Sequence, residues 1–213
     1  ETDFRGERFA HLPGQQRGNN DLLVLSRPEV IREIHTRYLE AGADIIETCT
    51  FNSQSISLAD YHCESLVKEI NFAAAQLART CADNYATPEK PRFVAGSVGP
   101  TNKTCSLSPD VNDPALRTLH FDELAIAYQE QIEALLEGGV DAILIETVFD
   151  TLNAKAAVVA AQAAMSTKGR EVPIMISVTV ADKGGRTLSG QTLEAFLASF
   201  STMPIFSVGL NYS

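Results

Sequence analysis

The sequence predicts an α/β fold built on a parallel sheet. Segments with apolar residues at helical spacing alternate strictly with short, nearly continuous apolar runs, which is the pattern of successive βα units. Such runs are typical of parallel strands that are buried on both faces. Two of the units also resemble each other, because EAGADIIETCTF and EGGVDAILIETVF both pass from a helix end through a glycine turn into a strand. The length of 213 residues fits one domain.

Five strands are expected, and their number limits the architecture. They occupy residues 44–50, 92–99, 141–148, 173–180 and 205–210. A closed parallel β/α barrel of the TIM type needs eight strands in about 250 residues. The sequence therefore predicts either an open sheet or an incomplete barrel with about five of the eight strands. Residues 101–120 lack periodicity, and a loop of this length is often a functional lid or a partner-facing segment.

Five helices are expected, and local signals set several of their ends. Their apolar faces lie within residues 30–38, 66–81, 124–135, 151–165 and 193–200. The first helix is predicted to start at Ser26, which can form a capping box with Glu29, and to end at Gly42. Asp150 precedes the fourth helix and is predicted to be its N-cap. The stretch through Asn20 is polar and is expected to be irregular.

Composition and charge exclude several classes of function. The formal net charge is -10 and no cluster of Lys and Arg is visible, so no nucleic-acid partner is expected. No apolar run approaches the ~20 residues that span a membrane, and no basic, apolar-cored leader indicates secretion. The four cysteines lack the close pairing of a zinc motif, so we expect reduced thiols in a cytoplasmic protein.

Carboxylates at strand ends are the first candidates for a site. Glu47 and Glu146 stand at equivalent ends of two predicted strands. Ligands bind at the carboxyl ends of the strands both in barrels and in open parallel sheets. A carboxylate there can hold an ammonium group or act as an acid or base, although it can equally cap a helix or pair with a basic side chain. Thr48 follows Glu47 in a polar loop and is a further candidate for substrate binding.

A family resemblance adds to this reading. Eight segments carry it: FRGERF, GNNDLLVLSRPEVI, AGADIIETCTFNS, VGPTNKT, SPDVNDPA, ILIETVFDTLNAKAA, IMISVTV and RTLSGQTLEAF. In this order they resemble the homocysteine-binding, zinc-dependent barrel at the N-terminus of cobalamin-dependent methionine synthases. The likeness extends from about Asp3 to Ser213 and favours this family over betaine- and S-methylmethionine-dependent homocysteine methyltransferases. It implies that residues 1–213 are a partial homocysteine S-methyltransferase domain with an incomplete β/α barrel.

The resemblance also implies a reaction, cofactors and partners. A methyl group passes from methylcobalamin, and ultimately from methyltetrahydrofolate, to the zinc-activated thiolate of homocysteine, which gives methionine. Zinc is useful because a thiol with a pKa of ~8.5 is mostly protonated at neutral pH, whereas the thiolate is the nucleophile. The implied partners are homocysteine and the folate- and cobalamin-binding domains of a parent protein. In the family the glutamate of ILIET contacts the amino group of homocysteine, which is Glu146 here, and Asn211 belongs to the strand-end motif GLNC.

The zinc ligands of the family are not found in this sequence. The family holds zinc with three cysteines, and Tyr212 stands at the position of the first. A phenol with a pKa of ~10 is a weak zinc ligand at neutral pH. The GGCCG motif of the other two cysteines and the DGAMGT substrate loop do not occur, and Cys49 stands where the family commonly has Asn. We therefore expect that this chain does not bind zinc and is inactive as it stands.

Two interpretations remain open at this stage. The chain is either a piece of an active methyltransferase or a non-catalytic α/β fragment that binds a small ligand or a partner. In both cases five strands leave two unpaired parallel edges, at residues 44–50 and 205–210. Unpaired edges tend to recruit other chains, so self-association is expected.

Overall fold

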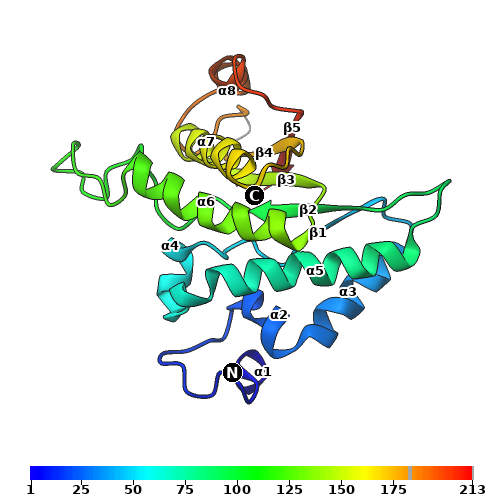
Figure 1. Cartoon of the computed structure of the whole chain (residues 1–213). Coiled ribbons are helices and arrows are strands. Elements are labelled where there is room, and N and C mark those ends of the chain that lie inside the picture. The colour runs from blue at the N-terminus through cyan, green and yellow to red at the C-terminus, as the bar shows by residue number, and fades with distance from the viewer. Residues whose placement is uncertain (182–183, 213) are drawn as a thin grey trace.

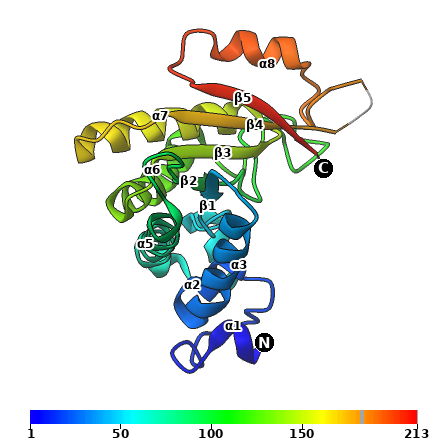
Figure 2. The same cartoon turned by 90° about the vertical axis from the view of Figure 1, so that its right-hand side faces the viewer.

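The computed structural model describes residues 1–181 and 184–212, without the side chain of Tyr212. Its centre is a five-stranded parallel sheet with the strands in chain order (Figure 1). The strands are β1 (Ile45–Glu47), β2 (Phe93–Val98), β3 (Ala142–Val148), β4 (Ile174–Val180) and β5 (Ser207–Tyr212). The sheet curls, and its convex side is covered by helices (Figure 2). The predicted fold class, an incomplete β/α barrel with five strands, is confirmed.

Five longer helices alternate with the strands, and several short ones lie between residues 2 and 66. The longer helices are α3 (Pro28–Glu40), α5 (Val67–Tyr85), α6 (Phe121–Gly138), α7 (Thr151–Lys168) and α8 (Leu193–Phe200). The short ones are α1 (Thr2–Arg5), η1 (Asn20–Leu22), α2 (Leu23–Ser26), α4 (Ser55–Leu58), η2 (Ala59–Tyr61) and η3 (Glu64–Leu66). Within residues 1–181 and 184–212, no helix is long and apolar enough to cross a membrane.

Some predicted helix ends are confirmed. The Asp150 carboxylate accepts hydrogen bonds from the backbone N–H groups of Leu152 and Asn153, so it is the N-cap of α7. Gly42 follows α3 with a φ of +103°, a left-handed conformation that glycine adopts without penalty. The polar sequence around Asp150 therefore encodes a local structure that forms as expected.

Three predicted details are wrong. The Ser26 side chain does not cap α3, because its hydroxyl donates to the carbonyl of Leu22 just before α2, and α3 begins at Pro28 without a side-chain cap. The first strand is shorter than predicted, since only residues 45–47 pair as a strand. The stretch through Asn20 is not wholly irregular, because α1 lies within it.

One hydrophobic core fills the space between the sheet and its helices. The buried side chains of the strands, such as Ile46, Val94, Ile143 and Ile176, face the helices. Helices α5 and α6 approach closely at Gly138, where a Cβ atom would lie 2.5 Å from the Cβ of Ala75. The alternate strand residues face the open concave side, and this side holds the polar groups described below.

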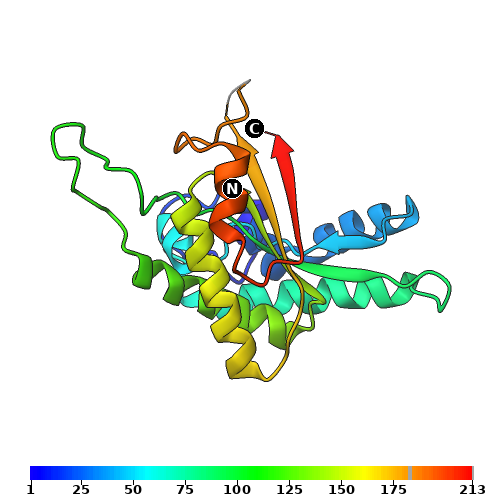
Figure 3. The same cartoon turned by 90° about the horizontal axis from the view of Figure 1, so that it is seen from above.

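Residues 101–120 form no helix or strand, as predicted, and extend away from the sheet (Figure 3). The base of this segment is fixed to the start of α7. The Asn153 side chain bonds to the backbone of Cys105 at 2.9 Å and to the carbonyl of Lys103 at 2.8 Å. The far part is exposed, with Val111 95% accessible. Only the base of the segment therefore belongs to the packed domain.

Candidate functional site

The carboxyl ends of the five strands form one rim of the sheet, where three of the predicted residues lie. Glu47 is the last residue of β1, Glu146 lies near the end of β3, and Asn211 lies near the end of β5. The alternation of buried and exposed residues places Glu47 on the concave side, because Ile46 before it faces the helices. Parallel strands thus bring together side chains that are far apart in the chain.

A β-bulge shapes this rim in β3. The pairing with β4 passes from Ile145 opposite Ile176 to Val148 opposite Val178, so that two residues of β3 stand opposite the single residue Ser177. The two are Glu146 and Thr147, and Thr147 has a φ of +58°. A β-branched residue rarely adopts this left-handed conformation. The bulge lets Glu146 and Thr147 share the concave side while Val148 stays buried in the core.

The Glu146 carboxylate is half-buried and held in place. Its Oε1 accepts a hydrogen bond from the hydroxyl of Ser97 on β2. Burial raises the pKa of Glu146, and the bond from Ser97 opposes that rise. The part of the carboxylate that does not bond to Ser97 faces the concave side. The group is therefore oriented by the protein but lacks a positive partner among the described residues.

Thr48 helps to hold the part of β2 that carries Ser97. Its side-chain oxygen accepts a hydrogen bond from the backbone N–H of Ser97 at 3.0 Å and lies 2.7 Å from the hydroxyl of Thr50. Thr50 in turn donates to the carbonyl of Ser97. Thr48 is buried, so its visible role is to fasten the end of β1 to β2. A direct contact of Thr48 with substrate stays a prediction.

Asp21, which the sequence patterns did not single out, also belongs to the rim. It lies in η1, is buried, and its Oδ2 accepts hydrogen bonds from the Asn52 backbone and the Ser53 hydroxyl, both at 2.7 Å. Burial raises the pKa of Asp21 to about 6 against these two hydrogen bonds, and the charge of Glu146 adds to the rise. The candidates were chosen among residues at the ends of predicted strands. Asp21 was not among them, because it precedes every strand.

Negative charge on the rim is therefore incompletely compensated. Although much of Glu47 is exposed, partial burial of its carboxyl raises its pKa, and the charge of Glu146 raises it further. Glu47, Glu146 and Asp21 thus all have pKa values shifted in the same direction. Such shifts mean that the charged forms are destabilised and that a cation bound nearby would be favoured.

Asn211 connects three strands. Its Nδ2 donates to the Thr147 hydroxyl oxygen at 2.9 Å, and its Oδ1 accepts from the hydroxyls of Ser177 and Thr179, each at 3.0 Å. Most of the hydrogen-bonding capacity of this amide is therefore used within the protein. A direct contact with substrate stays a prediction. The backbone of Tyr212 pairs with Val180, whereas its side chain lies outside the described residues.

The described residues do not fit the three-cysteine zinc site that the family resemblance implies. Cys49 lies near Asp21, and burial raises its pKa to about 12, so it is a neutral thiol rather than a metal-binding thiolate. All four cysteines are free, and Cys63, Cys81 and Cys105 are buried. In the part of the chain that the structure describes, no three His, Cys, Asp or Glu side chains are grouped to hold a metal.

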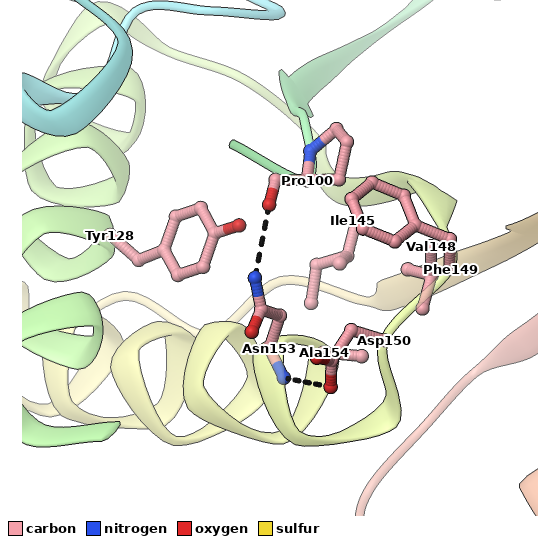
Figure 4. Close-up of a pocket in the computed structure, with 8 residues that line it drawn as sticks. All are labelled: Pro100, Tyr128, Ile145, Val148, Phe149, Asp150, Asn153 and Ala154. Carbon is pink, nitrogen blue, oxygen red and sulfur yellow. Dashed lines mark hydrogen bonds between the residues drawn. The ribbon is translucent and has the colours of Figure 1, made fainter. Parts of the chain in front are cut away.

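A small cavity lies behind β3, on the helix side (Figure 4). Its volume is about 10 Å³, which suits one water molecule but no substrate. Around it the Tyr128 hydroxyl donates to the carbonyl of Gly99 at 2.8 Å, and Asn153 donates to the carbonyl of Pro100 at 3.2 Å. The helix side of the rim is thus closely packed, and a ligand that contacts Glu146 must approach from the concave side.

Comparison with known proteins agrees with this architecture. The model of the homocysteine S-methyltransferase family matches residues 2–213. Crystal structures of the homocysteine methyltransferase MmuM from Escherichia coli are similar in their metallated, oxidized and apo forms, with TM-scores of 0.72, 0.73 and 0.67. Their sequence identities are 22%, 20% and 24%, over 89%, 94% and 92% of this chain. At these identities the likeness shows a shared fold, and the chain spans 65%, 68% and 66% of those chains.

The raised pKa of Asp21 predicts a pH-dependent stability. The unfolded chain loses this proton near the ordinary pKa of 3.8, whereas the folded chain keeps it until about pH 6. Between these values the folded state binds more protons, so the free energy of unfolding falls as pH rises, and the loss is complete above pH ~6. Urea unfolding between pH 4 and 7 should show a loss larger by roughly 2 kcal/mol for the wild type than for Asp21→Asn.

The control is Glu89→Gln, which removes an exposed carboxylate from a loop and should leave the pH dependence of the wild type unchanged. If the curves of the wild type and Asp21→Asn run parallel over this range, Asp21 does not keep its proton in the folded state.

Proposed function

The chain belongs to the homocysteine S-methyltransferase family, and from this premise we propose that its concave rim binds homocysteine for methylation at sulfur. One observation carries the proposal: the Glu146 carboxylate is fixed by Ser97 and faces the concave side without a cationic partner among residues 1–181 and 184–212. The α-ammonium of an amino acid would supply that partner. A charge-assisted hydrogen bond of this kind is stronger than one between neutral groups, so it can select an amino acid over an uncharged thiol.

The proposed role of the chain is to hold and orient the amino-acid end. Glu146 contacts the ammonium, and the charges of Glu47 and Asp21 increase the attraction for a cation. In the transfer itself, the thiol proton is lost to water, a lone pair on the homocysteine sulfur forms the new S–CH₃ bond, and the bond from the methyl group to its donor breaks with its electron pair remaining on the donor. Orientation of the sulfur toward the donor lowers the entropic part of the barrier.

We further propose that the donor is methylcobalamin, as in cobalamin-dependent methionine synthases, with folate- and cobalamin-binding domains as partners in a cytoplasmic protein. The support is the set of sequence segments that resemble that family. The alternative donors are S-methylmethionine and betaine. A second candidate function is binding without transfer, which is favoured by Tyr212 at the position of a zinc cysteine.

A donor assay separates these possibilities. The purified chain is incubated with zinc, homocysteine and one of three donors, namely methylcobalamin, S-methylmethionine or betaine, and methionine is measured together with bound zinc. We expect homocysteine to bind and no donor to give methionine with this chain by itself, because Tyr212 stands at the position of the family's first zinc cysteine. Stoichiometric zinc together with methionine formation would refute binding without transfer, and the productive donor would then identify the subtype.

Replacing Glu146 tests the proposed contact. Glu146→Gln keeps the size of the side chain but removes the charge that pairs with the ammonium. Calorimetry should show an affinity for L-homocysteine weakened by about tenfold or more, since a hydrogen bond between charged groups is worth about 1.5–3 kcal/mol. The affinity for γ-mercaptobutyrate, which lacks the amino group, should change little.

The matched control is Glu171→Gln, an exposed carboxylate at the opposite end of the strands. It should leave both affinities unchanged. Equal weakening of both ligands in Glu146→Gln would mean that Glu146 does not recognise the ammonium.

Self-association is the remaining expectation. Among the described residues β1 and β5 are the edges of the sheet, and Ile45, Val208 and Leu210 on them are exposed. Light scattering at rising concentration should therefore show masses above the 23.0 kDa of one chain. Leu210→Lys should reduce the effect, because a charge on an edge strand opposes pairing, whereas Ile126→Lys on α6 should not. A monomer at every concentration would contradict the expectation.

A further inference from the structure

The bulge in β3 requires an explanation, because its conformation is unfavourable in isolation. Thr147 is β-branched and has a φ of +58°. Residues in such conformations persist only where the surrounding structure fixes them, and they concentrate at functional sites. The contacts of Thr147 should therefore identify what holds the bulge.

Asn211 makes the contact that fixes Thr147. Its Nδ2 donates to the Thr147 side-chain oxygen at 2.9 Å. Its Oδ1 is in turn held by the hydroxyls of Ser177 and Thr179, each at 3.0 Å. Both acceptor positions of the amide are thus filled from β4, which orients the donor toward β3. The Asn211 side chain on β5 is thus anchored to β4 and holds the backbone conformation of Thr147 on β3.

The conformation of Thr147 determines how the next residues are placed. With strict alternation after Ile145, Thr147 would point into the helix-side core and Val148 to the concave side. In the structure Val148 is 3% exposed in the core, and Glu146 and Thr147 lie together on the concave side. Glu146 faces the concave side with or without the bulge, but it is one of the two bulge residues, so the backbone that carries its carboxylate is held by the same local structure that turns Thr147 to this side.

We propose that Asn211 is a positioning residue, which locks the Thr147 bulge and so presents Glu146 to the ammonium group of the substrate. This inference rests on the proposed function. It gives Asn211 a role that acts through Thr147 rather than through the direct substrate contact expected from the sequence. Such a role makes the selection of an amino group depend on a residue of β5 that need not touch the ligand.

The first test compares two ligands in Asn211→Ala. The affinity for L-homocysteine should weaken by roughly tenfold, because a misdirected carboxylate loses most of a charge-assisted hydrogen bond. The affinity for γ-mercaptobutyrate, which has no amino group, should change by less than about twofold. Ser207→Ala, at the other end of β5, is the matched control and should behave as the wild type in both titrations. Equal losses for both ligands would overturn the inference.

The second test uses glycine at position 147. Glycine adopts a φ of +58° without a steric penalty, so Thr147→Gly should keep the bulge without help from Asn211. In the Thr147→Gly background, Asn211→Ala should weaken homocysteine binding by less than about twofold, compared with roughly tenfold in the wild-type background. The same loss in both backgrounds would show that Asn211 does not act through Thr147.

The crystal structure of Asn211→Ala provides a readout that does not depend on binding. The inference expects Thr147 to leave the left-handed conformation and the pairing of Val148 with Val178 to change. If Glu146→Gln discriminates between the two ligands and Asn211→Ala does not, the inference fails while the proposed function stands. If the wild type binds neither ligand, the proposed function fails, and an unchanged bulge in the Asn211→Ala structure would then overturn the inference as well.

Discussion

The alternation of side chains along a parallel strand is the constraint on which this structure depends. The strands β1 to β4 bury alternate residues against the helices, and the residues between them face the concave side. In β1 this rule alone places Glu47 beside the open face. In β3 the rule is broken once, directly after Glu146. The positions of the polar side chains on the rim therefore follow from the packing of the core, except at the bulge in β3.

On this rim burial disfavours the charged form of the carboxylates, whereas hydrogen bonds favour it. Glu146 and Asp21 are removed from water sufficiently to raise their pKa values, and each has hydrogen-bond donors that stabilise the charged form. Ser97 orients one carboxylate, and the loop at residues 52–53 holds the other. The result is negative charge that is fixed in position but not neutralised. A site of this kind attracts a compact cation with little rearrangement of the protein.

Local patterns in the sequence were sufficient for the fold and for the position of several residues on the rim. Helical spacing and apolar runs give the order of elements, and the polar residue before an alanine-rich helix identifies Asp150 as a cap. Strand-end position identifies Glu47 and Glu146. The bulge at Thr147 could not be predicted, because it depends on hydroxyl and amide contacts from two other strands. Asp21 was missed for the same reason, since its partners lie about thirty residues later, at Asn52 and Ser53.

The segment at residues 101–120 divides into a fixed base and a free end, and this division affects how the sequence can change. Asp150 and Asn153 hold its base against α7 through backbone atoms of Cys105 and Ser106. The backbone N–H groups of Cys105 and Ser106 donate these bonds, and the Ser106 hydroxyl donates a further one to Asp150, so the base constrains both the chain length and the residue at position 106. At the exposed end of the segment, around Val111, the structure does not restrict the chain length or the residue types in this way. Insertions and substitutions there should accumulate during evolution without disturbing the rim, so the segment is a place where related proteins can acquire new partners.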